Sequence, residues 1–176
     1  MSLKLTTDFN MKVKISYLFS RNKKVGSKVI AWASGLLIQD LEKIPSHMAV
    51  LVEYEDFDAP FVIESVLESG VRLVPYKKWK EINEECYKIS SKKTIEFTEI
   101  AKITDEYWGK KYDWGGILYF GWRFLLHFLF KLPFPKENAW QSDSRYFCNE
   151  LAGEIAGYHK YNMVTPAKMC SDFLKM

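Results

Sequence analysis

Apolar and polar residues alternate in five short stretches of the first half of the chain. Alternation with a period of two places apolar side chains on one face of an extended segment and therefore predicts strands. The middle three stretches follow one another closely, so we expect them to form an antiparallel meander. The predicted strands cover 12–20, 47–54, 61–67, 71–74 and 84–90.

Apolar residues recur at helical spacing once before the meander and repeatedly after the last strand. Thr165 followed by Pro166 is typical of the start of a helix. Strands that precede most of the helices predict an α+β fold, in which an antiparallel sheet or half-barrel has helices packed on one side. The predicted helices cover 25–37, 94–108, 114–130 and 146–158, with a last helix from Pro166.

The length and composition predict one domain over 1–176, because 176 residues with 48% hydrophobic residues suffice for a single core. Lys and Arg are scattered and the net charge is +3, which argues against nucleic acid as a partner. No pattern indicates an oligomeric state. The amino-terminal residues lack the apolar segment and cleavage site of a secretory signal, so we expect a cytoplasmic protein.

The three cysteines, at positions 86, 148 and 170, are odd in number and share no metal-ligand spacing with the three histidines. This pattern predicts neither a disulfide framework nor a metal site, and we expect no cofactor. A reducing compartment fits this use of cysteine best.

Residues 114–130 form a strongly apolar and aromatic segment. Basic side chains interrupt or follow it at every fourth position, at Arg123, His127 and Lys131, so that they form one polar stripe on a helix. The pattern predicts an amphipathic helix that packs in the core rather than one that spans a membrane. The alternative is that residues 114–134 contact a membrane surface or an apolar substrate.

Cys148 is placed near the start of the predicted helix 146–158, where small residues such as Ala152 would let the helix lie tightly on a sheet. Backbone N–H groups and the helix dipole stabilise an anion in the first turn, which favours the reactive thiolate form of a cysteine. The alternative is a small buried apolar residue, which is what we expect of Cys86 and Cys170.

His47 and Glu64 are candidate partners for this thiol. His47 begins the strand 47–54 on the face opposite to its apolar residues, and Glu64 lies on an otherwise apolar face of the next strand. A buried carboxylate needs a partner, and it would orient His47 as the acid of a catalytic triad does. The alternatives are a histidine without a catalytic role and a cross-strand ion pair of Glu64 with Arg72.

Two other histidines are rival bases. His159 would lie about 16 Å from Cys148 along the axis of a shared helix, at about 1.5 Å per residue, which is too far for contact. His127 belongs to the basic stripe and would reach the thiol only if its helix crossed the groove where sheet and helices meet. We therefore favour His47 as the base.

Five segments together resemble the circularly permuted NlpC-like hydrolases of the papain fold, in particular the YiiX-like branch. In that family the histidine and the acid precede the cysteine, which is their order here. The resemblance implies Cys148 as nucleophile, His47 as base and Glu64 as orienting acid, and it assigns Tyr112 to stabilisation of an oxyanion. The segments are SHMAVLVE, FVIESVLESGVRLVPYKKW, GKKYDWGG, YFCNEL and TPAKM.

The activity that this resemblance implies is thiol-dependent hydrolysis of an amide bond through an acyl-enzyme. The expected substrates are peptides, among them the stem peptides of bacterial cell walls. One alternative is a hydrolase or acyltransferase that acts on lipids or thioesters, because related permuted folds act on lipids. A second alternative is a non-catalytic binding module on the same fold.

Overall fold

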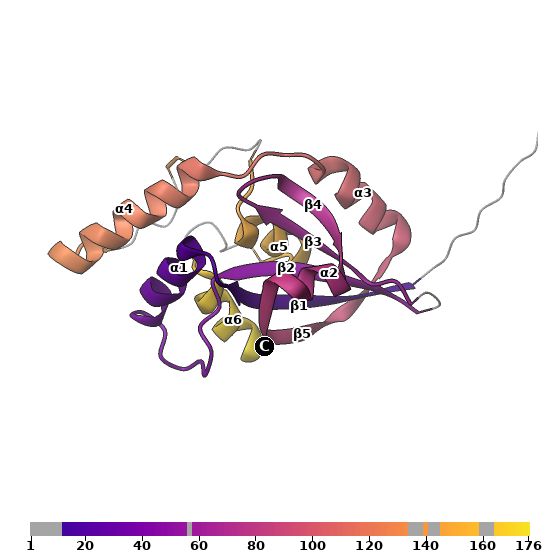
Figure 1. Cartoon of the computed structure of the whole chain (residues 1–176), viewed down its shortest axis with the longest axis horizontal. Helices are drawn as coiled ribbons and strands as arrows, with labels where there is room; N and C mark the ends of the chain where they lie inside the picture. Colours follow the sequence, from indigo (N-terminus) through magenta and orange to yellow (C-terminus); the bar gives the residue numbers. More distant parts are fainter. Residues whose placement is uncertain (1–11, 56–57, 134–138, 141–144, 159–163) are drawn as a thin grey trace, which may run out of the picture.

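The computed structural model describes residues 12–55, 58–133, 139–140, 145–158 and 164–176. These residues form a five-stranded sheet in which all neighbouring strands are antiparallel, in the order β4-β3-β2-β1-β5 (Figure 1). The strands are β1 (Lys12–Asn22), β2 (His47–Tyr54), β3 (Phe61–Val66), β4 (Gly70–Pro75) and β5 (Asn83–Glu96).

One helix follows β1, another separates β4 from β5, and the other described helices come after β5. This order confirms the predicted α+β class, and the pairing of β2 with β3 and of β3 with β4 confirms the predicted meander. The helices are α1 (Val25–Gly35), α2 (Tyr76–Ile82), α3 (Phe97–Tyr107), α4 (Trp114–Phe130), α5 (Cys148–Ala156) and α6 (Pro166–Leu174).

Alternating side chains of β2 contribute to two separate apolar clusters. Val50 belongs to the larger cluster, with Leu151 of α5 and Met169 of α6. Leu51 belongs to the smaller cluster, with Trp79 of α2. Because successive residues of a strand point to opposite faces, helices cover both faces of the sheet. The prediction that helices pack on one side only is therefore wrong, and α2 is the helix that it omits.

The boundary between β5 and α3 also differs from the prediction. A helix was expected from residue 94, but Thr94 and Ile95 pair with β1, and α3 begins at Phe97. Ile95 lies at helical spacing from the apolar residues of α3, which explains the prediction. In the structure it belongs to β5 and packs in the core from there. Pairing with the long strand β1 decides the conformation where local spacing is ambiguous.

The aromatic helix α4 extends away from the sheet, beyond α1 (Figure 1). Its 17 residues are all described, and of these Gly116 alone is buried, whereas Trp122, Phe128 and Phe130 are more than half exposed. The prediction that this segment packs in the core is therefore wrong, because the helix runs past the edge of the sheet. Within the described part of the chain, we find no helix with the length and apolarity needed to cross a membrane.

Candidate active site

Cys148 is the first residue of α5, and α5 lies against β2 and β3. On the inner face of this helix Leu151 and Ala152 are each only 1% exposed. The helix begins two residues later than the sequence predicted, because Phe147 is extended (φ −91°, ψ 170°). The thiol therefore lies in the first turn, where backbone N–H groups have no partner within the helix.

Hydrogen bonds hold the segment before α5 against β3 and against the segment that contains Tyr112. The Ser65 hydroxyl of β3 donates to the carbonyl oxygen of Tyr146 (2.5 Å). The N–H of Tyr146 donates to the carbonyl oxygen of Lys111 (3.1 Å), and the N–H of Asp113 donates to the carbonyl oxygen of Tyr146 (3.4 Å). These bonds place the segment that contains Tyr112 beside the start of α5, as expected if both belong to one site.

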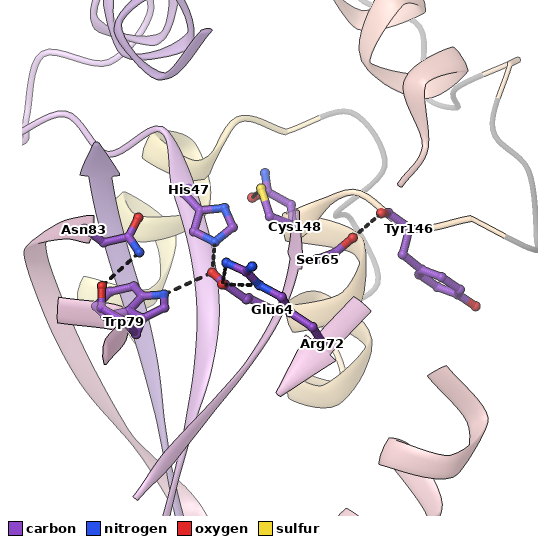
Figure 2. A network of polar contacts seen from close by, with 9 residues as sticks. His47, Glu64, Ser65, Arg72, Trp79, Asn83, Tyr146 and Cys148 are labelled. Carbon is purple, nitrogen blue, oxygen red and sulfur yellow. Dashed lines mark hydrogen bonds and ion pairs between the residues drawn. The ribbon is translucent and has the colours of Figure 1, made fainter. Parts of the chain in front are cut away.

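His47 starts β2, and Figure 2 shows its ring next to the Cys148 sulfur. The Nε2 atom of His47 is 2.8 Å from Oε2 of Glu64 on β3. Cys148, His47 and Glu64, which come from three different elements, therefore follow one another as sulfur, imidazole and carboxylate. The structure brings together the three residues that the sequence analysis selected.

Glu64 is 1% exposed and accepts hydrogen bonds from three side chains (Figure 2). Besides His47, Arg72 of β4 donates to Oε1 from Nε (3.0 Å) and Nη2 (2.7 Å), and Trp79 of α2 donates to Oε2 from Nε1 (3.0 Å). The two partners that the sequence analysis weighed for Glu64 are thus bound at the same time, His47 on Oε2 and Arg72 on Oε1. Trp79 was not predicted, because a helix as short as α2 has too few residues for a clear pattern.

The charges of this cluster shift the pKa values of His47 and Glu64 in opposite directions. Burial raises the pKa of Glu64, but the hydrogen bond and charge of His47, followed by those of Arg72, outweigh it and lower the pKa to about 2. Burial lowers the pKa of His47, but Cys148 and then Glu64 raise it to about 10. Cys148 and Glu64 therefore both favour the positively charged form of His47.

Asn149 lies directly beside the thiol and was not predicted as part of the site. The Cys148 thiol is 3.6 Å from Asn149 Oδ1, to which it can donate a weak hydrogen bond. Asn149 Nδ2 donates to the carbonyl oxygen of Val164 (2.7 Å), and the Asn149 side chain is buried. The residue therefore connects the start of α5 with the segment that leads into α6.

Tyr112 borders the same groove as Cys148, in agreement with its predicted place beside the site. The pKa of its phenol is raised well above 10, first by burial and then by the charges of Cys148, Glu150 and Asp113. The phenol is therefore protonated throughout the neutral range and can donate a hydrogen bond. This is the property required of a group that stabilises an oxyanion.

The rival residues have other surroundings. His127 Nδ1 forms a hydrogen bond with the carbonyl oxygen of Leu132 (2.8 Å) at the end of α4, whereas His47 lies beside the thiol. His159 lies outside the described residues. Cys170 is fully buried, as predicted, but Cys86 in β5 is partly exposed, which corrects the expectation that it is buried.

Glu150, in the first turn of α5, is also buried, as are Glu64 and Asp113. Its Oε2 accepts a hydrogen bond from the N–H of Phe147 (2.9 Å), and Oε1 has no hydrogen-bond partner among the described residues. Burial is the main cause that raises its pKa to about 8, from an ordinary value of 4.5. The backbone bond to Phe147 explains why a carboxyl group occupies this position, since it holds the extended residue that starts the helix.

We expect Glu150→Gln to remove part of the pH dependence of stability. Between about pH 4.5 and 8 the native protein keeps the Glu150 proton that the unfolded chain releases, so the free energy of unfolding falls as pH rises. The variant should be more stable than the wild type at pH 9 by on the order of 1–4 kcal/mol, with little difference at pH 4.5. Urea unfolding at both pH values measures this, with Glu81→Gln, at an exposed position of α2, as control. If the free energy of unfolding changes equally with pH in Glu150→Gln and in the wild type, the pKa assigned to Glu150 is wrong.

Cys148 opens onto a groove of about 830 Å³ that separates α1 from α4. We call it the α1–α4 groove. Tyr112, Asn149 and Thr165 border it at the cysteine, and apolar side chains of the two helices form most of its walls. Cys148 itself is only 6% exposed, so this groove is the route by which a substrate can reach the sulfur.

No protein-family model, curated protein or solved structure matches this chain.

Proposed function

We propose that this protein is a thiol-dependent hydrolase with a papain-like arrangement, in which Cys148 attacks an acyl carbon, His47 is the base and Glu64 orients the histidine. One observation supports the proposal above all others. A thiol at the start of a helix, an imidazole and a buried carboxylate lie in sequence, with the 2.8 Å contact between His47 and Glu64 at its far end (Figure 2).

In the first step His47 accepts the proton of the Cys148 thiol, which gives a thiolate beside an imidazolium. The sulfur attacks the carbonyl carbon, a C–S bond forms, and the electron pair of the carbonyl bond moves to oxygen. When this intermediate collapses, the bond to the leaving group breaks and His47 gives its proton to the leaving nitrogen or oxygen. Water then attacks the thioester, His47 takes a proton from it, and the C–S bond breaks to release a carboxylic acid.

Two kinds of donor are available for the negative oxygen of the intermediate. The first-turn N–H groups of α5 point along the helix axis towards its start, where Cys148 lies. The protonated phenol of Tyr112 borders the same groove and would add a side-chain donor. Donors fixed before the reaction stabilise the developing charge without reorganisation, and one such donor is worth about 10²–10³ in rate.

The expected scissile bond is an amide, as the resemblance to NlpC-like hydrolases implies. Protonation of the leaving nitrogen is the demanding step for an amide, and His47 with its raised pKa carries the required proton at neutral pH. The same residues can act on esters and thioesters, and transfer to an acceptor other than water would give an acyltransferase. These substrates belong in the same test.

Detection of an acyl-enzyme tests this proposal. The full chain is mixed with p-nitrophenyl acetate, p-nitroacetanilide or an acetyl thioester, quenched in acid and analysed by intact-mass spectrometry and peptide mapping. We expect an acetyl group on Cys148, a burst of leaving group and subsequent turnover. If no substrate acylates Cys148 faster than it acylates Cys86, the proposed function is wrong and a non-catalytic binding module becomes the better interpretation.

A further inference from the structure

The α1–α4 groove has walls of nearly continuous hydrocarbon. Every residue of α4 that borders it is apolar or glycine, and α1 contributes apolar side chains such as Ile30 and Trp32 together with the polar Ser34. Several of these side chains are at least half exposed, among them Trp32 (66%) and Leu129 (58%). Exposed apolar surface of this extent is costly in water unless a ligand or partner covers it.

Apart from Ser34 of α1, the polar groups of the groove come from residues close in sequence to the proposed site residues or hydrogen-bonded to them. Ser46 directly precedes His47, Asn149 directly follows Cys148, and Thr165 follows the residue whose carbonyl oxygen binds Asn149. The groove therefore has a polar, reactive end and an apolar extension. A ligand that matches it has a carbonyl group at one end and a hydrocarbon part beyond it.

The apolar extension is long enough for a chain. The residues of α4 that border it run from Ile117 to Leu129, which at about 1.5 Å per residue is about 18 Å along the helix. The volume of about 830 Å³ lies within the range of about 300–1,000 Å³ that is usual for small-molecule sites. A long site between two helices fits an extended chain better than a compact ring system.

We propose that the α1–α4 groove binds a long hydrocarbon acyl chain and places its carbonyl carbon at the Cys148 sulfur. This inference rests on the proposed function, because it names the acyl half of the substrate. The substrate is then a fatty acyl amide, ester or thioester, whose leaving group departs from the polar end. Each methylene group moved from water into such a groove strengthens binding about fourfold.

A peptide in the apolar part of the groove would be a poorer ligand. Its backbone N–H and C=O groups would lose their bonds to water, and walls made of side chains such as Phe124 and Leu125 offer no donors or acceptors in exchange. Peptide recognition in extended form relies on hydrogen bonds from the main chain of a strand edge or on polar side chains. The chemistry of the walls therefore favours a hydrocarbon chain.

Gly121 offers a way to close the groove without disturbing the core. It borders the groove on α4, and a Cβ atom added there would meet no atom within 4 Å. Tryptophan also has a higher helix propensity than glycine, so Gly121→Trp should fill the groove while the helix is kept. Gly26 on α1 is equally unobstructed but does not border the groove, and Gly26→Trp is the matched control.

Hydrolysis of acetyl and decanoyl esters of p-nitrophenol, below their micelle concentrations, tests the inference. We expect kcat/KM to be at least about tenfold higher for the decanoyl ester with the wild type and with Gly26→Trp. Gly121→Trp should lower the ratio of decanoyl to acetyl kcat/KM by at least about tenfold relative to the wild type. The corresponding amides and thioesters identify the preferred leaving group.

Binding is measured separately from catalysis. Titration of Cys148→Ala with a fluorescent fatty acid, 11-(dansylamino)undecanoic acid, should show saturable binding that Gly121→Trp in the same background weakens at least about tenfold.

The two measurements separate the inference from the proposed function. Equal kcat/KM for both esters with Cys148-dependent hydrolysis would overturn the acyl-chain site and leave the hydrolase in place. If the wild type hydrolyses neither ester but the fatty acid still binds in the groove, the proposed hydrolase is wrong and the acyl-chain site remains. The protein could instead float with phosphatidylcholine vesicles while showing no chain-length preference and no fatty acid binding. That result would assign α1 and α4 to a membrane surface and overturn the inference.

Discussion

Replacement of Cys148 by alanine is expected to abolish acyl transfer, with a fall in kcat of at least about 10³-fold. The reason is that no other group next to His47 can form the covalent intermediate, and the residual rate would come from the oxyanion donors alone. The alanine side chain is slightly smaller and lies in a helix whose next turn already contains Ala152, so the fold should be retained. Steady-state hydrolysis of an acyl ester and an acyl amide measures the loss.

The matched control for this variant is Cys86→Ala. Cys86 is a partly exposed thiol in β5 and, like Cys148, is not in a disulfide. Its replacement should leave kcat and KM within about twofold of the wild type, as expected for a partly exposed position without a role in the site. Retention of full activity by Cys148→Ala, with circular dichroism unchanged, would show that the reaction takes place elsewhere.

Glu64→Gln is expected to lower kcat by at least about 10²-fold while KM changes little. The neutral amide cannot hold the imidazolium as a carboxylate does, and its NH₂ group can face His47 in place of an oxygen. Because Glu64 raises the pKa of His47, the variant should show a lower His47 pKa than the wild-type value of about 10. NMR titration of the His47 ring, together with the kinetics, measures both effects.

The same substitution changes stability with a defined sign. The wild-type pKa of Glu64 is lowered from 4.5 to about 2, so its ionised form stabilises the native state fully above pH 4.5 and less as pH falls towards 2. Glu64→Gln should therefore lose on the order of 2–3 kcal/mol at pH 7 and show a weaker loss of stability in acid. Glu53→Gln, which alters a partly exposed carboxylate paired with Lys88, is the control. Acid unfolding curves identical to the wild type would contradict the role given to Glu64.

The strands could be predicted from local signals, whereas the residues of the proposed triad were selected by local signals together with the family resemblance. Period-two alternation located β2 and β3, and the same alternation marked Glu64 as a carboxylate on a face suited to burial. A buried acid demands partners, which reduces the choice to residues on neighbouring strands. The start of α5 marked Cys148 by the general chemistry of a helix terminus.

The rest required the tertiary structure. Nothing in the local sequence shows that Trp79 packs on the same face of the sheet as Glu64 and donates to it, because α2 is too short to have a clear period. Nor does the composition of α4 distinguish a core helix from one that borders an apolar groove, since both need large side chains. The helix begins after Asp113, whose carboxylate caps it through the N–H of Gly116 (3.1 Å), and it then extends away from the sheet (Figure 1).

The most direct test of the central claim is the rate at which iodoacetamide alkylates Cys148 between pH 5 and 9, followed by peptide mass spectrometry in the wild type and in His47→Ala. If the sulfur and the imidazole form an ion pair, the wild-type rate should already be high at pH 6 and change little up to pH 9. In His47→Ala it should be low at pH 6 and rise with pH like that of an ordinary thiol, whose pKa is about 8.5. The same rising curve for both proteins would contradict the account.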